Sequence, residues 1–225
     1  MFNSILFLGR KNCNYSNKIK KYLKKNTNKF SYFESNSFGD KLVVNNLKKK
    51  KFDFIFSYRS FVIIRDNLIK KCEYAPINFH PGPPEYRGTG CVNYALYENS
   101  KFYGCTSHII SSKIDYGKII DVKKFKINKN NSIDNVLRKT HKLMFERAIF
   151  IIKLLLKNPH NLSKLIAKSK KYKWSKKIKK LKDLEQFYII DKNISKSNFI
   201  KKIRATNTNK FKPYILLHNR KFIIN

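Results

Sequence analysis

The 225-residue chain is predicted to be an α/β protein with a mostly parallel sheet covered by helices on both faces. Short apolar segments alternate with helical patterns through the first half of the chain, which is the order that parallel sheets require. Hydrophobic residues make up 42% of the chain, enough for a sizeable core. Near the end, a helical pattern followed by two short apolar runs predicts a small helix–hairpin extension.

The expected strands are short apolar runs, and the expected helices carry apolar residues at steps of three and four. The strands are predicted at 4–9, 53–57, 75–79, 105–110 and 118–127, and the helices at 15–25, 40–50, 92–99 and 132–157, with a helical turn at 65–72. In open parallel sheets, ligands bind beyond the carboxyl ends of the strands. A functional site is therefore expected at that edge.

The chain is expected to divide into three parts. Residues 1–157 form the main domain, residues 158–190 a Lys-rich connecting segment, and residues 191–225 a short C-terminal extension. The connection is predicted to be irregular from about residue 159 to residue 182. The extension is predicted to contain a helix at 197–204 and strands at 213–217 and 221–224, joined by a three-residue turn.

The composition is strongly basic, with 50 Lys and Arg against 14 Asp and Glu and a formal net charge of +36. Such a charge favours an anionic partner: nucleic acid, a membrane surface or a phosphorylated substrate. It is also typical of a chain enriched in Lys, Asn and Ile by compositional bias. No Gly/Arg-rich tail or zinc-finger spacing accompanies the charge, which favours compositional bias, while an anionic partner stays open.

The four cysteines are scattered and form no C-x-x-C pair, which argues against a zinc site and suits reduced thiols in a cytoplasmic protein. The apolar segment near the start is too short for a signal peptide. The longest apolar run, 148–156, is far shorter than the roughly 20 residues of a membrane span. We therefore expect a cytoplasmic location, no metal and no membrane span.

Two polar side chains close one of the predicted strands. Asn78 and His80 are two residues apart, so an extended strand places both on one face. Residues 81–88 contain three prolines and two glycines and predict a rigid loop. Asp115 lies in a loop between two later strands. If the two loops were adjacent, the amide and imidazole could bind an oxyanion, and the carboxylate could orient the imidazole or accept a proton.

Other interpretations of these residues are possible. A lone histidine is usually structural, and an Asp near a Gly is common in turns. A Cys–His hydrolase built from Cys105 and His80 is disfavoured, because Cys105 lies inside a predicted strand without a helix N-terminus to lower its pKa. A metal site of His80, His108 and Asp115 is disfavoured because Asn78 stands where a second histidine would be expected. His108 alone is as consistent with a structural role as with a site role.

Four blocks of sequence carry a resemblance to a known family. They are Asn78-Phe79-His80-Pro81, Tyr86-Arg87-Gly88, Gly104-Cys105-Thr106-Ser107-His108 and Ile114-Asp115-Tyr116-Gly117-Lys118-Ile119-Ile120. In order and separation they resemble the folate-dependent formyltransferases, which include glycinamide ribonucleotide, methionyl-tRNA and sugar N-formyltransferases. The resemblance covers roughly residues 1–157 and, more weakly, 203–206 and the final hairpin. It implies a Rossmann-like catalytic domain that transfers a formyl group from 10-formyltetrahydrofolate to a primary amine.

The resemblance also implies roles for individual residues. Asn78, His80 and Asp115 would be catalytic: the first two would stabilise the oxyanion, and Asp115 would polarise His80 or relay the proton of the amine through water. The stretch 57–63 corresponds to the family's pteridine-binding segment. The implied cofactor-binding residues are Phe61, Val62, Ile63 and Gly117.

The acceptor amine is less well defined. Glycinamide ribonucleotide formyltransferases have a Gly/Ser-rich phosphate loop after the first strand, whereas residues 9–14 here lack the necessary small residues. Only about 35 residues follow residue 191, too few for the C-terminal domain of the tRNA enzymes. A nucleotide-linked amino sugar is the favoured substrate, with Arg10 and Lys11 binding its diphosphate and Tyr86 and Arg87 on the acceptor side, where they also fix the Pro-rich loop.

Two alternatives remain. One is a methionyl-tRNA formyltransferase-like enzyme, since so basic a protein would attract tRNA. The other is a noncatalytic RNA-binding protein on the same scaffold, motivated only by the charge. The C-terminal hairpin could also support a homodimer.

Overall fold

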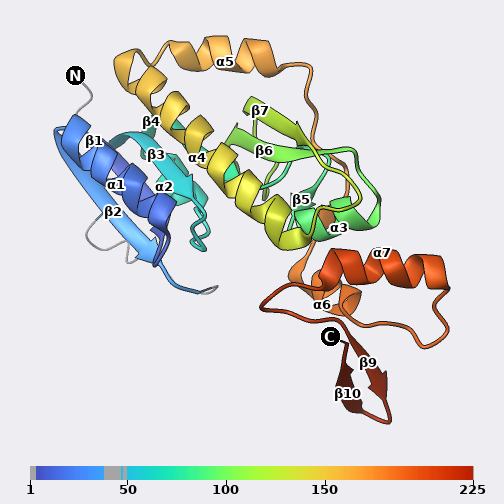
Figure 1. Ribbon diagram of the computed structural model, residues 1–225. Coiled ribbons are helices and arrows are strands. Elements are labelled where there is room, and N and C mark those ends of the chain that lie inside the picture. Colours follow the sequence, from blue (N-terminus) through green and yellow to red (C-terminus); the bar gives the residue numbers. More distant parts are fainter. Residues whose placement is uncertain (1–3, 38–46, 48–49, 225) are drawn as a thin grey trace.

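A computed structural model describes residues 4–37, 47 and 50–224, and its centre is a six-stranded sheet (Figure 1). The strand order is β2-β1-β3-β4-β6-β7. Their bounds are Ser4–Arg10 (β1), Lys29–Ser35 (β2), Phe52–Tyr58 (β3), Cys72–His80 (β4), Phe102–Ile109 (β6) and Ile119–Lys126 (β7). The first four in this order are parallel, and β6 and β7 continue the sheet antiparallel. The predicted mostly parallel sheet is confirmed, with β2 as an edge strand that was not predicted.

Helices cover both faces of the sheet, as the alternating pattern predicted. The helices α1 (Asn14–Asn26) and α4 (Ile133–Lys157) cross one face (Figure 1), where they bury the apolar side chains of β1, β3 and β4. The short helix α2 (Asp66–Ile69) packs on the opposite face through Leu68. Ser132 starts α4 as a side-chain cap, because its Oγ accepts the N–H of Asn135 at 3.2 Å.

A second hydrophobic cluster joins the C-terminal extension to the sheet. Helix α7 (Lys196–Thr206) packs against α3 (Cys91–Tyr97), and the Asn93 side chain donates to the carbonyl of Ala205 at 2.7 Å. The extension lies at one end of the molecule, with its hairpin projecting outward (Figure 1). Its position places α3, which follows the Pro-rich loop, between the extension and the sheet.

The segment predicted to be irregular is largely ordered. It contains α5 (Asn161–Ser169), the two-residue strand β8 (Ile178–Lys179) and the start of α6 (Leu181–Phe187). The prediction of irregular structure was wrong because many lysines obscure the apolar spacing of Leu162, Leu165 and Ile166, which pack against the main core.

The final hairpin is present with a shorter turn than predicted. The strands are β9 (Tyr214–Leu217) and β10 (Arg220–Ile223), and Arg220 pairs directly with Leu217. The two turn residues, His218 and Asn219, have φ of 45° and 60°, as a two-residue type I′ turn requires. The helix predicted at 40–50 lies outside the described residues except at positions 47 and 50. Among the residues with described structure, none of the helices combines the length and apolarity needed to cross a membrane.

Candidate active site

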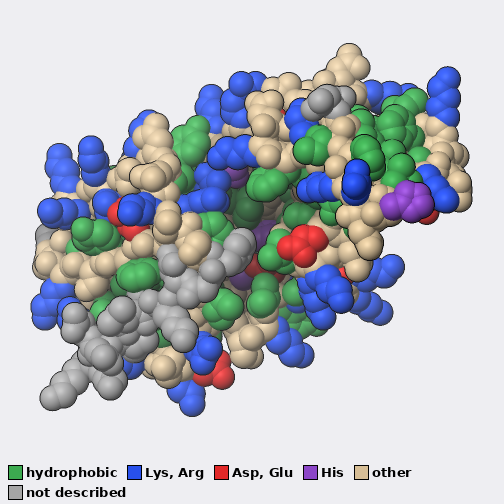
Figure 2. Space-filling view, turned by 90° about the horizontal axis from the view of Figure 1, so that it is seen from below, with side chains coloured by type: hydrophobic (Ala, Val, Ile, Leu, Met, Phe, Trp, Pro, Cys, Tyr) green, Lys and Arg blue, Asp and Glu red, His purple; other side chains and the backbone are tan. Residues whose placement is uncertain are grey.

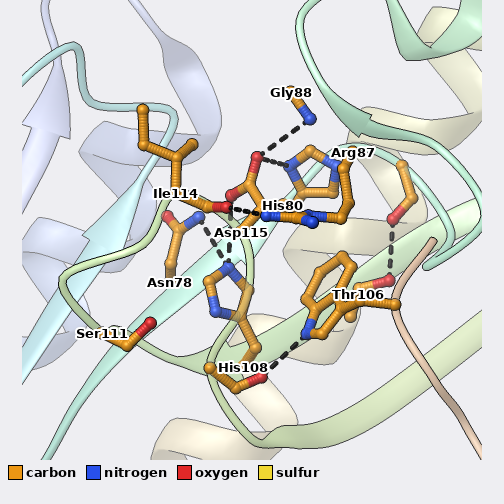
Figure 3. A network of polar contacts seen from close by, with 12 residues as sticks. Asn78, His80, Arg87, Gly88, Thr106, His108, Ser111, Ile114 and Asp115 are labelled. Atoms are coloured by element: carbon orange, nitrogen blue, oxygen red, sulfur yellow. Dashed lines mark hydrogen bonds and ion pairs between the residues drawn. The ribbon is translucent and has the colours of Figure 1, made fainter. Parts of the chain in front are cut away.

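The three residues predicted to be catalytic meet at the carboxyl end of β4. His80 is the last residue of β4, and β4 pairs with β6 so that Asn78 lies opposite His108. The chain returns from β6 through the loop that carries Asp115. The carboxylate of Asp115 lies between the two rings (Figure 3), with Oδ2 3.4 Å from His80 Nδ1 and Oδ1 3.4 Å from His108 Nε2. Asn78 Nδ2 lies 3.2 Å from His108 Nε2, so the strand-end and loop residues form one network.

The backbone around Asp115 is shaped to hold its carboxylate. Asp115 has a φ of 44°, a left-handed conformation that Asp tolerates better than most residues. The N–H of Gly88 donates to Asp115 Oδ2 at 3.2 Å. Gly88 itself has a φ of 86°, and a Cβ there would lie 2.1 Å from the carbonyl oxygen of Lys179. The Tyr86-Arg87-Gly88 block therefore needs glycine to bring its N–H to the carboxylate.

The charges in this network follow from its contacts. Burial alone lowers the pKa of His80, but the negative charge of Asp115 and the contact with Cys91 outweigh burial and raise the pKa to about 9. Burial alone raises the pKa of Asp115, yet His80, His108 and the Gly88 N–H hold it well below its usual range. At neutral pH the pair is an imidazolium beside a carboxylate.

The other nitrogen of His80 faces the Pro-rich loop and α3. Nε2 lies 3.1 Å from the carbonyl of Tyr86 and 3.6 Å from the thiol sulfur of Cys91, whose S–H donates to the carbonyl of Gly88 at 3.2 Å. The thiol beside His80 thus belongs to Cys91, a contact that the sequence did not predict. Burial raises the pKa of Cys105 to about 12, which makes that thiol a poor nucleophile.

A strap formed by residues 173–179 crosses the site from the C-terminal part of the chain. The indole N–H of Trp174 donates to the carbonyl of Gly117 at 2.8 Å, and its ring packs edge-on against His80 and His108, with centroids 6.0 and 5.1 Å away. Trp174 is the only tryptophan in the chain. No local pattern in the sequence indicated its position, because the surrounding lysines suggested a solvated connection.

Arg87 ties the strap to the loop of Asp115. Its guanidinium donates to the carbonyls of Ile114 at 2.8 Å and Ser175 at 3.1 Å, and it lies 4.6 Å above the ring of Tyr116. The short strand β5 (Arg87–Gly88) pairs with β8 of the strap. Arg87, predicted on the acceptor side, is buried and uses its Nη groups to hold these backbone segments. Tyr86 donates its hydroxyl to Glu98 at 2.8 Å.

The remaining predicted residues lie on neighbouring strands. Phe61, Val62 and Ile63 follow β3: Phe61 is half-buried, Val62 buried and Ile63 exposed. Arg10 ends β1, and its guanidinium lies 4.5 Å from the Phe61 ring centroid. Lys11 follows it and is exposed. These five residues lie at the end of β1 or just after β1 and β3, and in the sheet β3 lies beside β4 and β1 beside β3.

The face that bears the carboxyl ends of the strands is hollowed. Figure 2 views this face and shows histidine side chains within the hollow near the centre, with Lys and Arg side chains around it. In the described part of the chain, no group of three or more His, Cys, Asp or Glu residues is arranged to hold a metal ion. The centre instead offers an amide, an imidazolium and one carboxylate in a largely buried setting.

The fold and this site define an α/β protein with polar residues gathered at the carboxyl ends of a mostly parallel sheet, where proteins of this class bind their ligands. A family model described as formyl transferase matches residues 7–153, more than half of the chain. The chain therefore belongs to the formyl transferase family.

Individual relatives are distant. Methionyl-tRNA formyltransferase of Mycoplasmopsis pulmonis is 24% identical over 168 residues, which cover 74% of this chain and 56% of that enzyme. A sugar N-formyltransferase structure from Shewanella sp. superposes with a TM-score of 0.71 at 19% identity, covering 100% of this chain and 96% of that one. An N-formyltransferase from Helicobacter canadensis was solved with folinic acid and dTDP-3-aminofucose. It superposes with a TM-score of 0.67 at 18% identity, and the match covers 98% of this chain and 86% of that one. The chain thus spans little more than half of the curated relative, and the structural likeness establishes the fold.

Proposed function

We propose that this protein transfers a formyl group from 10-formyltetrahydrofolate to the primary amine of a nucleotide-linked amino sugar. The observation that carries the proposal is the convergence of Asn78, His80 and Asp115 at one sheet edge. The family resemblance assigns catalysis to these three residues, and their separation in sequence gave no guarantee that they would meet.

The chemistry of the centre suits a formyl group. Attack on a formyl carbon places negative charge on its oxygen, and N–H donors aimed at that charge lower the barrier. His80 carries a proton at neutral pH because its pKa is raised to about 9, and the Asn78 amide lies on the same side of the strand. The 3.4 Å separation of His80 from Asp115 is longer than a tight charge-assisted hydrogen bond. The Nδ1 proton can therefore be shared with the substrate oxygen.

Each residue then has a defined task. As the amine nitrogen bonds to the formyl carbon, His80 and Asn78 donate to the formyl oxygen. Asp115 keeps His80 charged and relays the proton that the amine loses, through water, to the donor nitrogen. As that nitrogen takes up this proton, its bond to the formyl carbon breaks. Trp174 and the buried loop limit the access of water to the two imidazoles.

The donor is assigned to the segment after β3. Folinic acid is a ligand of the Helicobacter canadensis enzyme, and the family resemblance places the pterin along residues 57–63. In this chain the N–H groups of Phe61 and Val62 are already bonded to the hydroxyls of Ser35 and Ser60. These bonds fix the path of the loop that would border the pterin.

The match along the whole chain supports the choice of acceptor class. Sugar N-formyltransferases of similar length superpose on this protein through its C-terminal extension, and the Helicobacter canadensis enzyme was solved with a nucleotide-linked amino sugar. Methionyl-tRNA is the second candidate, favoured by the Mycoplasmopsis pulmonis relative and by the net charge of +36.

The test offers purified protein and 10-formyltetrahydrofolate a panel of nucleotide-linked 3- and 4-amino sugars, with methionyl-tRNA in parallel, and detects formylated products by mass spectrometry. We expect formylation of an amino sugar. The variants His80→Ala and Asp115→Ala should each lower turnover about 10²-fold or more, while Arg220→Gln on the distant hairpin should not. Formylation of methionyl-tRNA alone would show that the acceptor is the tRNA and not an amino sugar. The absence of any formylated product and of any donor consumption would refute the proposal.

A further inference from the structure

Three side chains that can carry positive charge gather beside the reaction centre. Arg10 ends β1, and Arg59 follows the end of β3. Leu8 pairs with Ser57 across these strands, so the two arginines, each two residues further on, extend from adjacent strands at the same level. His141 lies on α4, and its backbone carbonyl accepts the hydroxyl of Tyr58 at 3.3 Å, which holds that turn of α4 above the end of β3. All three side chains are partly buried.

No acidic group balances this cluster among the described residues. The guanidinium of Arg10 lies on the Phe61 ring, and Arg59 Nη1 contacts the sulfur of Cys13 at 3.5 Å. Burial, and then the charge of Arg59, lower the pKa of Arg10. Burial together with Arg59 and Arg10 lowers the pKa of His141 to about 4. Partly buried like charges without a counter-charge are unfavourable, and a bound anion would remove the penalty.

The position of the cluster matches the reaction centre. Tyr58 pairs with Phe79, so Arg59 is level with His80 on the neighbouring strand, and Arg10 is one strand further away. With strands about 4.8 Å apart, the backbone positions of Arg59 and Arg10 lie roughly 5 and 10 Å along the sheet edge from that of His80. An anionic group joined to the reacting amine by a sugar ring would span that distance. Guanidinium pairs bind phosphate oxygens well because their donors form a planar fork.

We propose that Arg10, Arg59 and His141 form an anion subsite that binds the phosphate groups of the acceptor. The inference rests on the proposed function for the identity of the ligand, but the subsite itself requires only that these three residues bind a phosphate-type anion. The proposal adds Arg59 and His141 to Arg10, which the sequence analysis already assigned to the diphosphate. It places the phosphates at the ends of β1 and β3, beside the site of His80 and Asp115.

The first experiment measures binding of inorganic pyrophosphate by calorimetry at fixed ionic strength, which needs no turnover. We expect Arg10→Gln and Arg59→Gln each to weaken binding about tenfold or more. Arg220→Gln removes the same charge from an exposed hairpin position and should leave the affinity unchanged. An equal loss in all three variants would mean that binding reflects only the overall charge, and would overturn the subsite.

A second measurement uses the wild-type chain and therefore does not depend on whether a variant folds. Addition of pyrophosphate should shift the imidazole NMR signals of His141, and unmoved signals at saturation would overturn the proposal. In turnover assays, Arg59→Gln should raise KM for the phosphorylated acceptor while KM for the donor stays constant. A rise confined to the donor would instead show that the cluster binds a carboxylate of the folate. Specific pyrophosphate binding without formylation of any amine would retain the subsite and reject the proposed function.

Discussion

His80 is buried and His141 is partly buried, yet their environments shift their pKa values in opposite directions. Burial lowers the pKa of both. Asp115 and Cys91 contact His80 and raise its pKa to about 9, whereas burial, and then Arg59 and Arg10, lower the pKa of His141 to about 4. The carboxylate beside His80 therefore reverses the effect that burial has on both rings. One region is equipped to donate protons to a developing anion, and the other is left with positive charge that a ligand can neutralise.

Removal of the Asp115 carboxylate beside His80 should have the largest effect on turnover. Asp115→Asn keeps the size of the side chain but leaves burial as the main influence on His80, so the pKa of His80 should fall below 6.5. His80 would be neutral at pH 7, and turnover should fall about 10²- to 10³-fold. NMR titration of the His80 ring and the pH profile of kcat check this prediction. In the wild type, the contribution of protonated His80 should disappear as the pH rises through 9, and an unchanged His80 titration in the variant would contradict it.

The contrast between these regions was only partly predictable from the sequence. Asn78 and His80 could be placed together because strand periodicity and the following Pro-rich loop are local signals. The meeting of this strand end with Asp115 depends on pairing between β4 and β6, and it was expected only through the family resemblance.

Other site residues gave no local signal at all. Trp174 reaches the imidazoles because β8 pairs with β5, an association of residues about 90 positions apart in a Lys-rich stretch. Arg59 and His141 come together only because β3 ends beneath α4. Helix α5 was missed for a simpler reason, since its apolar residues are diluted by lysines, and β2 mixes polar and apolar residues as edge strands do.

Substitution of Trp174 in the strap should have an intermediate effect on kcat. Trp174→Phe keeps a ring beside His80 and His108 but loses the bond to the Gly117 carbonyl, so the loop of Asp115 should be less well held. We expect kcat to fall roughly threefold to tenfold with little change in KM, as for the loss of one hydrogen bond of about 1 kcal/mol. Trp174→Ala should cost more. Tyr172→Phe, which alters a neighbouring aromatic residue, is the control, and a wild-type kcat in Trp174→Phe would mean that the strap does not position the centre.

The smallest effect is expected for His141→Gln, which should change how the free energy of unfolding depends on pH. A histidine whose folded pKa lies near 4 binds its proton more readily in the unfolded chain, whose pKa is about 6.5, so the free energy of unfolding decreases as the pH falls from 6.5 to 4. The groups facing this ring from β1 and β3 are Arg10 and Arg59, which stay charged over that range. His141→Gln removes the titrating group but keeps the backbone carbonyl that Tyr58 binds. Between pH 7 and pH 4, the wild type should therefore lose on the order of 1 to 3 kcal/mol more than the variant in urea unfolding. The exposed His160→Gln should behave like the wild type. Pyrophosphate should reduce the wild-type loss, because an anion at the cluster offsets the repulsion from Arg59 and Arg10 that adds to burial in lowering the pKa of His141.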